Sequence, residues 1–362
     1  WFDRARPEPN LAEYLDLVAL GTVADVVPLD KNNRALVYNG LKRMRAGHCR
    51  PGIQALAEIS DKEIGTLSAQ DLGFAIGPRL NAAGRLDDIS TGIKCLIEED
   101  LAKARAIAST LNQLNKERRE IEREMTAEAD LLLSEQYLDT TKYGIGIYSQ
   151  TFHQGVVGIL AGRIKEKLNR PVIAFSNDSD SRSGELKGSA RSIEGLHIRD
   201  LLDQIAVKYP GLILRFGGHA MAAGLSIKKV HFERFCVIFD DLVKISVDPA
   251  QLEARVFSDG ELISKELSMN LVKEIELAGP WGSQFPEPTF HGQFALISQR
   301  IVGDAHLKLV LAMDERLVDA IAFRQPFLDD EPKQVRVVYK PQVNRYAGSE
   351  TLQLLVEHIE SI

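Results

Sequence analysis

The chain has 362 residues, of which 44% are apolar and 26% charged, the composition of a globular protein of two or three domains. Its longest apolar runs are far shorter than the roughly 20 residues that a membrane-spanning helix needs. The net charge of −7 argues against a protein that binds polyanions over its whole surface, although local basic clefts are compatible with it.

The chain opens with WFDRARPEPN, which has no starting methionine and no basic segment followed by an apolar one, so no signal peptide is predicted. We expect the chain to be a piece of a longer protein whose N-terminal part is absent. Cys49, Cys95 and Cys236 are widely spaced and suit neither a disulfide framework nor a CxxC metal site. They favour a reducing, cytoplasmic compartment.

Residues 1–98 contain two segments with candidate site residues. In GTVADVV, Asp25 is a lone carboxylate among apolar side chains, where a charge is costly unless it is paired or binds a cation. It is either a helix-cap or turn residue, or one ligand of a metal whose other ligands come from elsewhere. In GPRLNAAGRLDD, Arg79, Asn81 and Arg85 stand among small residues that let a ligand approach, and an arginine fork matches phosphate oxygens. Ion pairs at a domain interface would explain them equally well.

Residues 99–138 contain neither glycine nor proline, and their apolar residues recur at helical spacing. This predicts one long amphipathic helix. The polar band from Asn115 to Arg123 interrupts the apolar stripe, as expected where no domain covers the helix. The helix either connects two domains, which we prefer, or is a solvated coiled-coil segment.

Residues 139–246 predict an α/β domain. YGIGIYS and RPVIAFS are typical of short buried strands, and HQGVVGILAGRIKEKL between them is typical of a helix opened by glycines. Gly155 and Gly158 leave backbone N–H groups and the positive end of the helix dipole available to an anion, next to His153 and Gln154. The spacing fits neither GxGxxG nor GxxxxGK[ST], so nucleotide-cofactor and P-loop sites are not predicted.

Two further segments of this region suit a phosphate. KGSARS places the hydroxyl groups of Ser189 and Ser192 beside Arg191, although an ordinary edge strand would also fit. RFGGHAMAAGLSI surrounds His219 with small residues, including Gly217 and Gly218. This segment is either a tight turn with a core histidine or bare backbone that a ligand approaches.

Residues 247–362 change in character from Pro280 onwards. Five strand candidates separated by polar or Gly/Asp turns predict a small barrel of the OB type. Such a barrel offers a groove for nucleic-acid backbone and stacked bases. Its aromatic candidates, for which core packing is the commoner role, are Trp281, Phe285, Phe323 and Tyr346.

Five segments around the long helix, taken together and in this order, resemble the RecJ family. The members of that family are single-strand-specific 5′-to-3′ DNA exonucleases and belong to the DHH phosphoesterase superfamily. The five segments are YLDLVALGTVADVVPLDKNNRALV, GPRLNAAGRL, HQGVVGILAGR, KGSARS and RFGGHAMAAGLSI. PWGSQFPEPTF and the strands after it resemble the OB domain of that family, so the resemblance covers essentially the whole chain. It implies an α/β multidomain protein with the C-terminal part of a DHH catalytic domain (1–98), a long connecting helix (99–138), a DHH-associated substrate-binding domain (139–246) and an OB-type nucleic-acid-binding domain (247–362).

The resemblance also implies two-metal phosphodiester hydrolysis with Mn²⁺ or Mg²⁺. Asp25 matches the last metal ligand of the family and is the expected catalytic residue. The family's earlier metal-binding motifs have no match here, so the chain alone is expected to be inactive. Ser189 and Arg191 would meet the terminal phosphate, and Arg79 or Arg85 a phosphate near the metals. The full set of implied nucleic-acid-binding residues is Arg79, Asn81, Arg85, His153, Gln154, Ser189, Arg191, Gly217, Gly218 and His219.

The partners implied by the resemblance are single-stranded DNA with a 5′ end, single-strand-binding protein and recombination helicases, in DNA repair and recombination. Two other classes stay open. A DHH-family oligoribonuclease or nucleotide phosphatase would share the GGH segment, but the appended barrel favours a polymeric substrate. A non-catalytic module for single-stranded nucleic acid would use the same helix and barrel as a scaffold.

Overall fold

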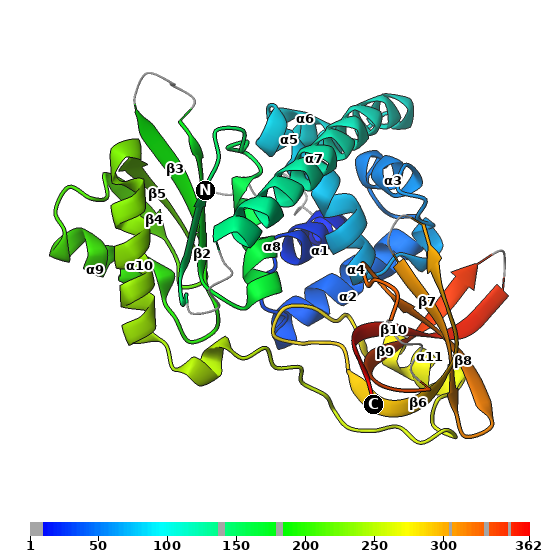
Figure 1. Cartoon of the computed structure of the whole chain (residues 1–362). Coiled ribbons are helices and arrows are strands. Elements are labelled where there is room, and N and C mark those ends of the chain that lie inside the picture. The colour runs from blue at the N-terminus through cyan, green and yellow to red at the C-terminus, as the bar shows by residue number, and fades with distance from the viewer. Residues whose placement is uncertain (1–9, 137–141, 179–183, 304–305, 329–332, 347–348) are drawn as a thin grey trace. The chain divides into compact units, whose positions relative to one another are not determined.

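The computed structural model describes residues 10–136, 142–178, 184–303, 306–328, 333–346 and 349–362 (Figure 1). The chain divides into two compact units, each assembled from separate stretches of sequence. The first unit comprises Trp1–Arg50, Ser60–Gly77 and Arg255–Ile362, and the second comprises Pro51–Ile59 and Pro78–Ala254. Within the described ranges, no helix is both long and apolar enough to cross a membrane.

The helical part of the first unit is held together by close contacts. Gly40 lets two helices pack on each other, because a Cβ atom at this position would meet the carbonyl oxygen of Leu15. The buried carboxylate of Asp16 forms an ion pair with Arg50. The elements are η1 (Leu11–Tyr14), α1 (Leu15–Ala24), α2 (Lys31–Arg45), η2 (Ile64–Thr66), α4 (Ala69–Asp71) and the π-helical turn η3 (Leu72–Ile76).

Five strands of the first unit close into a barrel in the order β10-β8-β7-β6-β9. Strands β8 and β10 run parallel, whereas the other neighbours are antiparallel. Alternate residues point inwards, so that leucine and valine side chains fill the interior together with Phe294 and Tyr339. This confirms the predicted OB-type barrel. Helix α11 (Met269–Ala278) precedes the strands, which are β6 (Phe290–Val302), β7 (His306–Met313), β8 (Arg316–Ala322), β9 (Gln334–Tyr346) and β10 (Ser349–Ser361).

Two of the aromatic candidates for base stacking pack inside the first unit instead. The rings of Trp281 and Phe285 stack with their centroids 4.8 Å apart, and the guanidinium of Arg34 lies 3.6 Å from the Phe285 centroid. The indole N–H of Trp281 donates to a backbone carbonyl of α11 at 3.0 Å. Phe323 is 57% exposed, and the side chain of Tyr346 lies outside the described part of the chain.

The second unit is built on a mixed five-stranded sheet of order β1-β2-β3-β5-β4. Strands β1 and β2 are parallel and are connected through α8, and the other neighbours are antiparallel. This confirms the predicted α/β character. The strands are β1 (Ile145–Tyr148), β2 (Val172–Asn177), β3 (Glu185–Arg191), β4 (Arg215–Gly218) and β5 (Ala222–Lys228). The helices are α3 (Pro51–Glu58), α5 (Gly77–Leu86), α6 (Ser90–Ile97), α7 (Leu101–Gln136), α8 (Val157–Leu168), α9 (Ile198–Lys208) and α10 (Phe232–Ser246), with the 3₁₀ turns η4 (Lys229–His231) and η5 (Pro249–Leu252).

The two faces of this sheet differ in their covering. Helices α9 and α10 pack on one face, over residues such as Phe175 and Leu225 (Figure 1). Helices α7 and α8 pack on the other face, where their apolar contacts are with β1 and β2, through residues such as Ile147 and Ala174. On that same face, β3, β5 and β4 carry polar and very small residues, which we call the open half-face: Lys187, Ser189, Arg191, Ala222, Gly224, Ser226, Arg215 and Gly217.

Helix α7 runs without interruption for 36 residues, as the absence of glycine and proline predicts. Asp100 caps its start, with its carboxylate accepting a hydrogen bond from the Lys103 N–H at 2.9 Å. The expectation that the polar band from Asn115 to Arg123 lies uncovered is wrong at Asn115, which is only 1% exposed. The reason is that the second unit packs around α7, which belongs to it.

Candidate nucleic-acid interface

Asp25 lies at the C-terminal end of α1, in a tight backbone turn. The Val26 N–H donates to the Val23 carbonyl at 3.1 Å, and the Val27 N–H donates to the Thr22 carbonyl at 3.0 Å. This pair of bonds is the Schellman motif, whose left-handed position usually holds glycine. Here it holds Val26 with φ 55°, a conformation that is strained for a β-branched residue. Such strain tends to occur at functional sites, and here it directly follows Asp25.

The side chain of Asp25 is exposed, so the expectation of a carboxylate surrounded by apolar side chains is wrong. Helix α1 ends at Ala24, and Asp25 is its C-cap. A carboxylate at a helix C-terminus faces the negative end of the helix dipole, which a nearby cation would compensate. Among the residues that the structure describes, no three His, Cys, Asp or Glu side chains are grouped so that they could hold a metal. Asp25 by itself therefore does not form a divalent-metal centre.

Ser189 and Arg191 of the KGSARS segment lie together at the first turn of α8. The Arg191 guanidinium donates to the Ser189 hydroxyl at 3.0 Å and to the Ala190 carbonyl at 2.8 Å. Gly158 is what allows this approach, because a Cβ atom there would lie 2.8 Å from Arg191 Nη2 and 2.9 Å from Ser189 Oγ. The predicted proximity of a cation, a hydroxyl and a helix N-terminus is therefore present in the second unit.

Arg85 of α5 repels both Arg191 of β3 and Arg118 of α7. Burial lowers the pKa of Arg191, and repulsion from the Arg85 guanidinium lowers it further. Burial also lowers the pKa of Arg118 on α7, as do Arg119, Arg85 and Arg163, against the attraction of Glu122. Arginine stays charged in proteins, so these like charges repel one another at a cost that a bound anion would offset. We call Arg85, Arg118, Arg191 and Ser189 the arginine cluster.

Arg85 is held in this cluster by the loop before α8. Its Nη1 donates to the Gly155 carbonyl at 3.1 Å. The Gly155 N–H in turn donates to Nδ1 of His153 at 3.1 Å, so the proton of the neutral imidazole is on Nε2. Because His153 is exposed, this Nε2–H can donate to an incoming acceptor. The loop thus couples a predicted arginine to a predicted histidine.

Two other predicted residues, Arg79 and Asn81, lie on α5. Arg79 on α5 donates through Nε to the Asn112 side chain on α7 at 3.0 Å. Asn81, also on α5, is exposed. Of the two candidate arginines, Arg85 hydrogen-bonds to the loop before α8 and repels Arg191, whereas Arg79 bonds to Asn112, so Arg85 is the better candidate for a phosphate ligand.

The GGH segment forms the end of β4 and the turn into β5. His219 is exposed, so its interpretation as a core histidine is wrong, and its backbone N–H donates to the Ala222 carbonyl at 2.8 Å. Gly218 has φ 148° and would place a Cβ atom 2.4 Å from the Ala222 carbonyl oxygen, so the turn requires glycine. Gly217 has no such constraint, because no atom lies within 4 Å of a Cβ built there.

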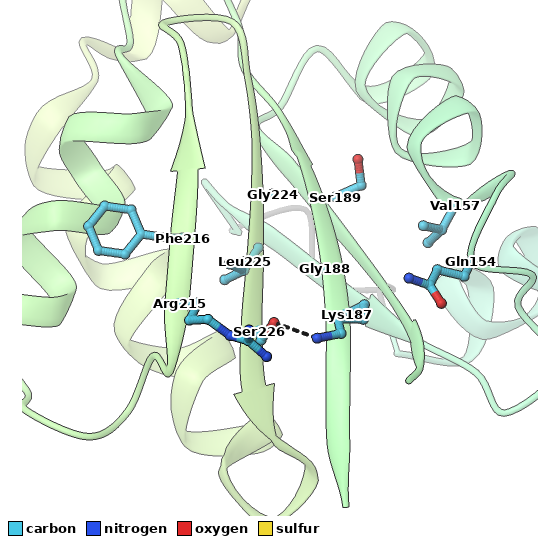
Figure 2. Close-up of a pocket in the computed structure, with 10 residues that line it drawn as sticks. All are labelled: Gln154, Val157, Lys187, Gly188, Ser189, Arg215, Phe216, Gly224, Leu225 and Ser226. Carbon is cyan, nitrogen blue, oxygen red and sulfur yellow. Dashed lines mark hydrogen bonds between the residues drawn. The ribbon is translucent and has the colours of Figure 1, made fainter. Parts of the chain in front are cut away.

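A hollow of about 440 Å³ lies over the open half-face (Figure 2). Gln154 and Val157 line it from the α8 side, and Ser189 and Gly224 line it from the sheet. Its volume is within the range of small-ligand sites. Sequence reasoning missed Lys187, which lines the hollow, and Arg118, which Arg85 repels. The position of Arg118 within the polar band of α7 was the only sequence signal that could have indicated it. Lys187 directly precedes the glycine of KGSARS, which could have marked it as a candidate.

Gly155 offers a test of how Arg85 is positioned. A Cβ atom there would lie 2.0 Å from the Arg85 carbonyl oxygen, so Gly155→Ala must displace backbone. We expect a loss of about 1–3 kcal/mol in the free energy of unfolding, the range for overpacking. Chemical denaturation measures this loss. The matched control is Gly162→Ala in α8, where no atom lies within 4 Å and alanine should stabilise by up to about 1 kcal/mol. Equal stability of the two variants would contradict the packing argument.

Two family models match separate parts of the chain. The DHHA1 domain model matches residues 141–244, and the RecJ OB domain model matches residues 258–358. The first match contains the five-stranded sheet with the open half-face, and the second contains the closed barrel. The matched regions therefore coincide with the two parts whose folds the sequence patterns predict.

Curated relatives and solved structures match over nearly the whole chain. The single-stranded-DNA-specific exonuclease RecJ of Dickeya dadantii is 54% identical and that of Escherichia coli 49% identical, over 99% of this chain and 63% of each relative. The crystal structure of RecJ in complex with Mg²⁺ from Thermus thermophilus superposes with a TM-score of 0.80 at 31% identity, covering 98% of this chain and 53% of that one. The chain is therefore similar to RecJ over nearly its whole length, and it spans less than two thirds of the relatives that it matches.

Proposed function

We propose that the protein is a metal-dependent exonuclease that degrades single-stranded DNA from a 5′ end, and that the arginine cluster binds a phosphate of that strand. The observation that carries this proposal is that Arg191 and Ser189 meet at the first turn of α8, while Arg85, which hydrogen-bonds to the loop before α8, lies near enough to repel Arg191. Guanidinium groups and a hydroxyl are ligands that suit phosphate oxygens, and clustering them without an anion is unfavourable. The names of the curated relatives supply the substrate class.

The residues around the cluster bind and orient the strand. Arg191 and Arg85 neutralise the phosphate, and Ser189 adds a hydroxyl donor. His153 Nε2–H and the Gln154 amide stand at the same end of α8, and His219 is exposed after β4. Arg79, Asn81, Gly217 and Gly218 complete the proposed contact set. These residues hold the substrate in position and transfer no proton.

Asp25 is the residue that we propose as a metal ligand. RecJ from Thermus thermophilus has been crystallised with Mg²⁺ and with Mn²⁺, and a carboxylate oxygen is a ligand that both ions accept. When bound, such a cation polarises a phosphoryl oxygen and activates water. The described residues supply only Asp25 to such a centre, so the remaining ligands of a two-metal site must come from other parts of the protein.

We also propose the domain assignment given by the sequence: the end of a DHH catalytic domain at 1–98, a connecting helix at 99–138, a substrate-binding domain at 139–246 and an OB domain at 247–362. The three free cysteines support a reducing, cytoplasmic location. The barrel supports contact with single-stranded DNA during repair and recombination. Single-strand-binding protein and recombination helicases are the proposed protein partners.

A nuclease assay tests the proposed activity. The 362-residue chain and the longer protein that contains it are each incubated with 5′-phosphorylated single-stranded DNA and Mn²⁺ or Mg²⁺. We expect nucleotide release from the 5′ end by the longer protein only, with loss on chelation and little release from a duplex of the same sequence. Binding without release by the longer protein would instead favour a non-catalytic module, and release from 3′ ends would overturn the polarity.

A further inference from the structure

Helix α7 holds the loop between β1 and α8 through a single carboxylate. Ser149 directly follows β1, and its hydroxyl donates to Oε1 of Glu128 at 2.5 Å. The Thr151 hydroxyl donates to Oε2 of the same carboxylate, and the Thr151 N–H donates to Ser149 Oγ at 3.2 Å. Both oxygens of Glu128 therefore fix the start of this loop. We call Glu128, Ser149 and Thr151 the carboxylate clamp.

The end of the same loop carries residues that are proposed to meet DNA. Phe152 is buried among apolar residues of α7 and α8. His153 is exposed and accepts from the Gly155 N–H, and Gln154 lines the hollow (Figure 2). Thr151 of the clamp comes directly before Phe152 in the sequence. A shift of the clamp would therefore reach both polar side chains of the loop.

The charge of Glu128 is unfavourable for a ligand that is itself an anion. Two other carboxylates of α7 are neutralised by cations of α8: Glu122 by Arg163 at 3.1 Å, and Asp130 by Lys167 at 2.8 Å. Glu128 forms no ion pair with any residue that the structure describes, and it is bonded to uncharged hydroxyl groups only. An unpaired negative charge beside a DNA-binding loop repels the strand. The hydrogen bonds of the clamp are a reason for a carboxylate here that this repulsion does not remove.

We propose that Glu128 is a positioning residue for DNA binding: by holding the start of the loop, it keeps His153 and Gln154 where they meet the strand. Binding groups are placed accurately when hydrogen bonds from a second layer of residues restrain them. Two charge-assisted hydrogen bonds to one helix provide such a restraint, because the loop cannot move from α7 without breaking both. In this role Glu128 makes no contact with DNA. The inference rests on the proposed function, because it takes the loop to bind single-stranded DNA.

Two substitutions at Glu128 separate positioning from charge, because the two effects have opposite signs. Glu128→Ala removes a negative charge, which alone would tighten binding of DNA. We expect its affinity for 5′-phosphorylated oligothymidylate to fall roughly 3- to 10-fold instead, the equivalent of about one hydrogen bond to the strand. Glu128→Gln offers one acceptor and one donor to the two hydroxyl groups, so its affinity should equal or exceed that of the parent. Fluorescence anisotropy on the whole chain, with the oligonucleotide labelled at its 3′ end, measures both.

The loop itself gives a second readout. Hydrogen exchange at the amides of residues 151–155 should be faster in Glu128→Ala than in the parent, and should be unchanged in Glu128→Gln. Ser149→Ala combined with Thr151→Val should weaken binding as Glu128→Ala does, and adding Glu128→Ala to this pair should weaken it no further. The matched control is Glu124→Ala, one turn earlier on α7, which removes an exposed carboxylate. Its binding should stay the same or tighten.

The remaining outcomes separate the positioning role from the phosphate site. Tighter binding by both Glu128 variants, or an equal loss in both, would overturn the positioning role. If Arg191→Ala weakens binding but Glu128→Ala does not, the positioning role is wrong while the phosphate site stands. If Glu128→Ala weakens binding and loosens the loop but Arg191→Ala has no effect, the positioning role stands and the phosphate assignment fails. If neither variant changes binding, both proposals fail.

Discussion

Arg191→Ala is expected to weaken binding of single-stranded DNA to this chain by roughly 10- to 150-fold, because a hydrogen bond to a charged group contributes about 1.5–3 kcal/mol. The loss should be similar for all sequences, because the proposed contact of the guanidinium is with phosphate and not with a base. The slope of the logarithm of affinity against the logarithm of salt concentration should become shallower by about one, because about one fewer counterion is released on binding. Fluorescence anisotropy at several salt concentrations measures both quantities.

The stability of this variant distinguishes a binding role from a structural one. Arg191→Ala removes hydrogen bonds to Ser189 and Ala190 but also relieves the repulsion from Arg85, so we expect the free energy of unfolding to change by no more than about 1 kcal/mol. Arg191→Lys should restore little affinity, because an ammonium cannot form two parallel hydrogen bonds. The matched control is Arg199→Ala on α9, whose guanidinium is exposed beside Asp200 at 3.3 Å. If both arginine variants bind DNA alike, the arginine cluster is not a phosphate site.

Asp25→Ala is expected to reduce nuclease turnover of the longer protein at least about 100-fold while leaving its affinity for single-stranded DNA within about twofold. Replacing a residue that only supports a metal ligand lowers metal affinity or activity about 10- to 100-fold. Losing the ligand itself should lower turnover at least as much. The side chain of Asp25 is exposed, and Asp25 takes part in the turn after α1 through its backbone N–H, which alanine keeps, so the fold should tolerate alanine. Initial rates at saturating Mn²⁺ measure the effect.

A neighbouring carboxylate provides the control for Asp25. Asp30 caps α2 by accepting from the Asn33 N–H at 2.8 Å, so Asp30→Ala should cost about 1 kcal/mol of stability. At a temperature where the Asp30→Ala variant is folded, its nuclease turnover should match that of the parent protein. If Asp25→Ala retains full turnover, Asp25 is a turn residue and not a metal ligand.

The long helix and the barrel were predictable because their information is local. Residues of α7 repeat at helical spacing with no glycine or proline, and the barrel strands alternate apolar and polar residues. The arginine cluster was only partly predictable. Arg85 and Arg191 stand among small residues that mark them, whereas Arg118 is one of many charged residues on α7 and is distinguished only by what packs around it.

The glycines of the GGH segment show a second limit of the sequence. Gly217 and Gly218 are adjacent and look equivalent, but only Gly218 has a backbone conformation that requires glycine. The predictions of an uncovered Asn115 and of an Asp25 surrounded by apolar side chains were likewise wrong. The exposure of a residue depends on which parts of the chain pack against it. Such properties arise from tertiary contacts that no local pattern records.

The discontinuous make-up of the first unit has a consequence for biosynthesis. Residues 1–50 share a unit with 255–362, and contacts such as the Leu29 N–H to the Ser283 carbonyl at 2.8 Å join the two stretches. A chain emerging from the ribosome has all residues of the second unit when residue 254 appears, whereas contacts between residues 1–50 and the barrel side of the first unit must wait for residues 255–362. Pairings of such long sequence separation form slowly and expose apolar surface meanwhile. The second unit can therefore be complete first, whereas Leu29 gains its Ser283 partner only after the barrel side of the first unit has been synthesised.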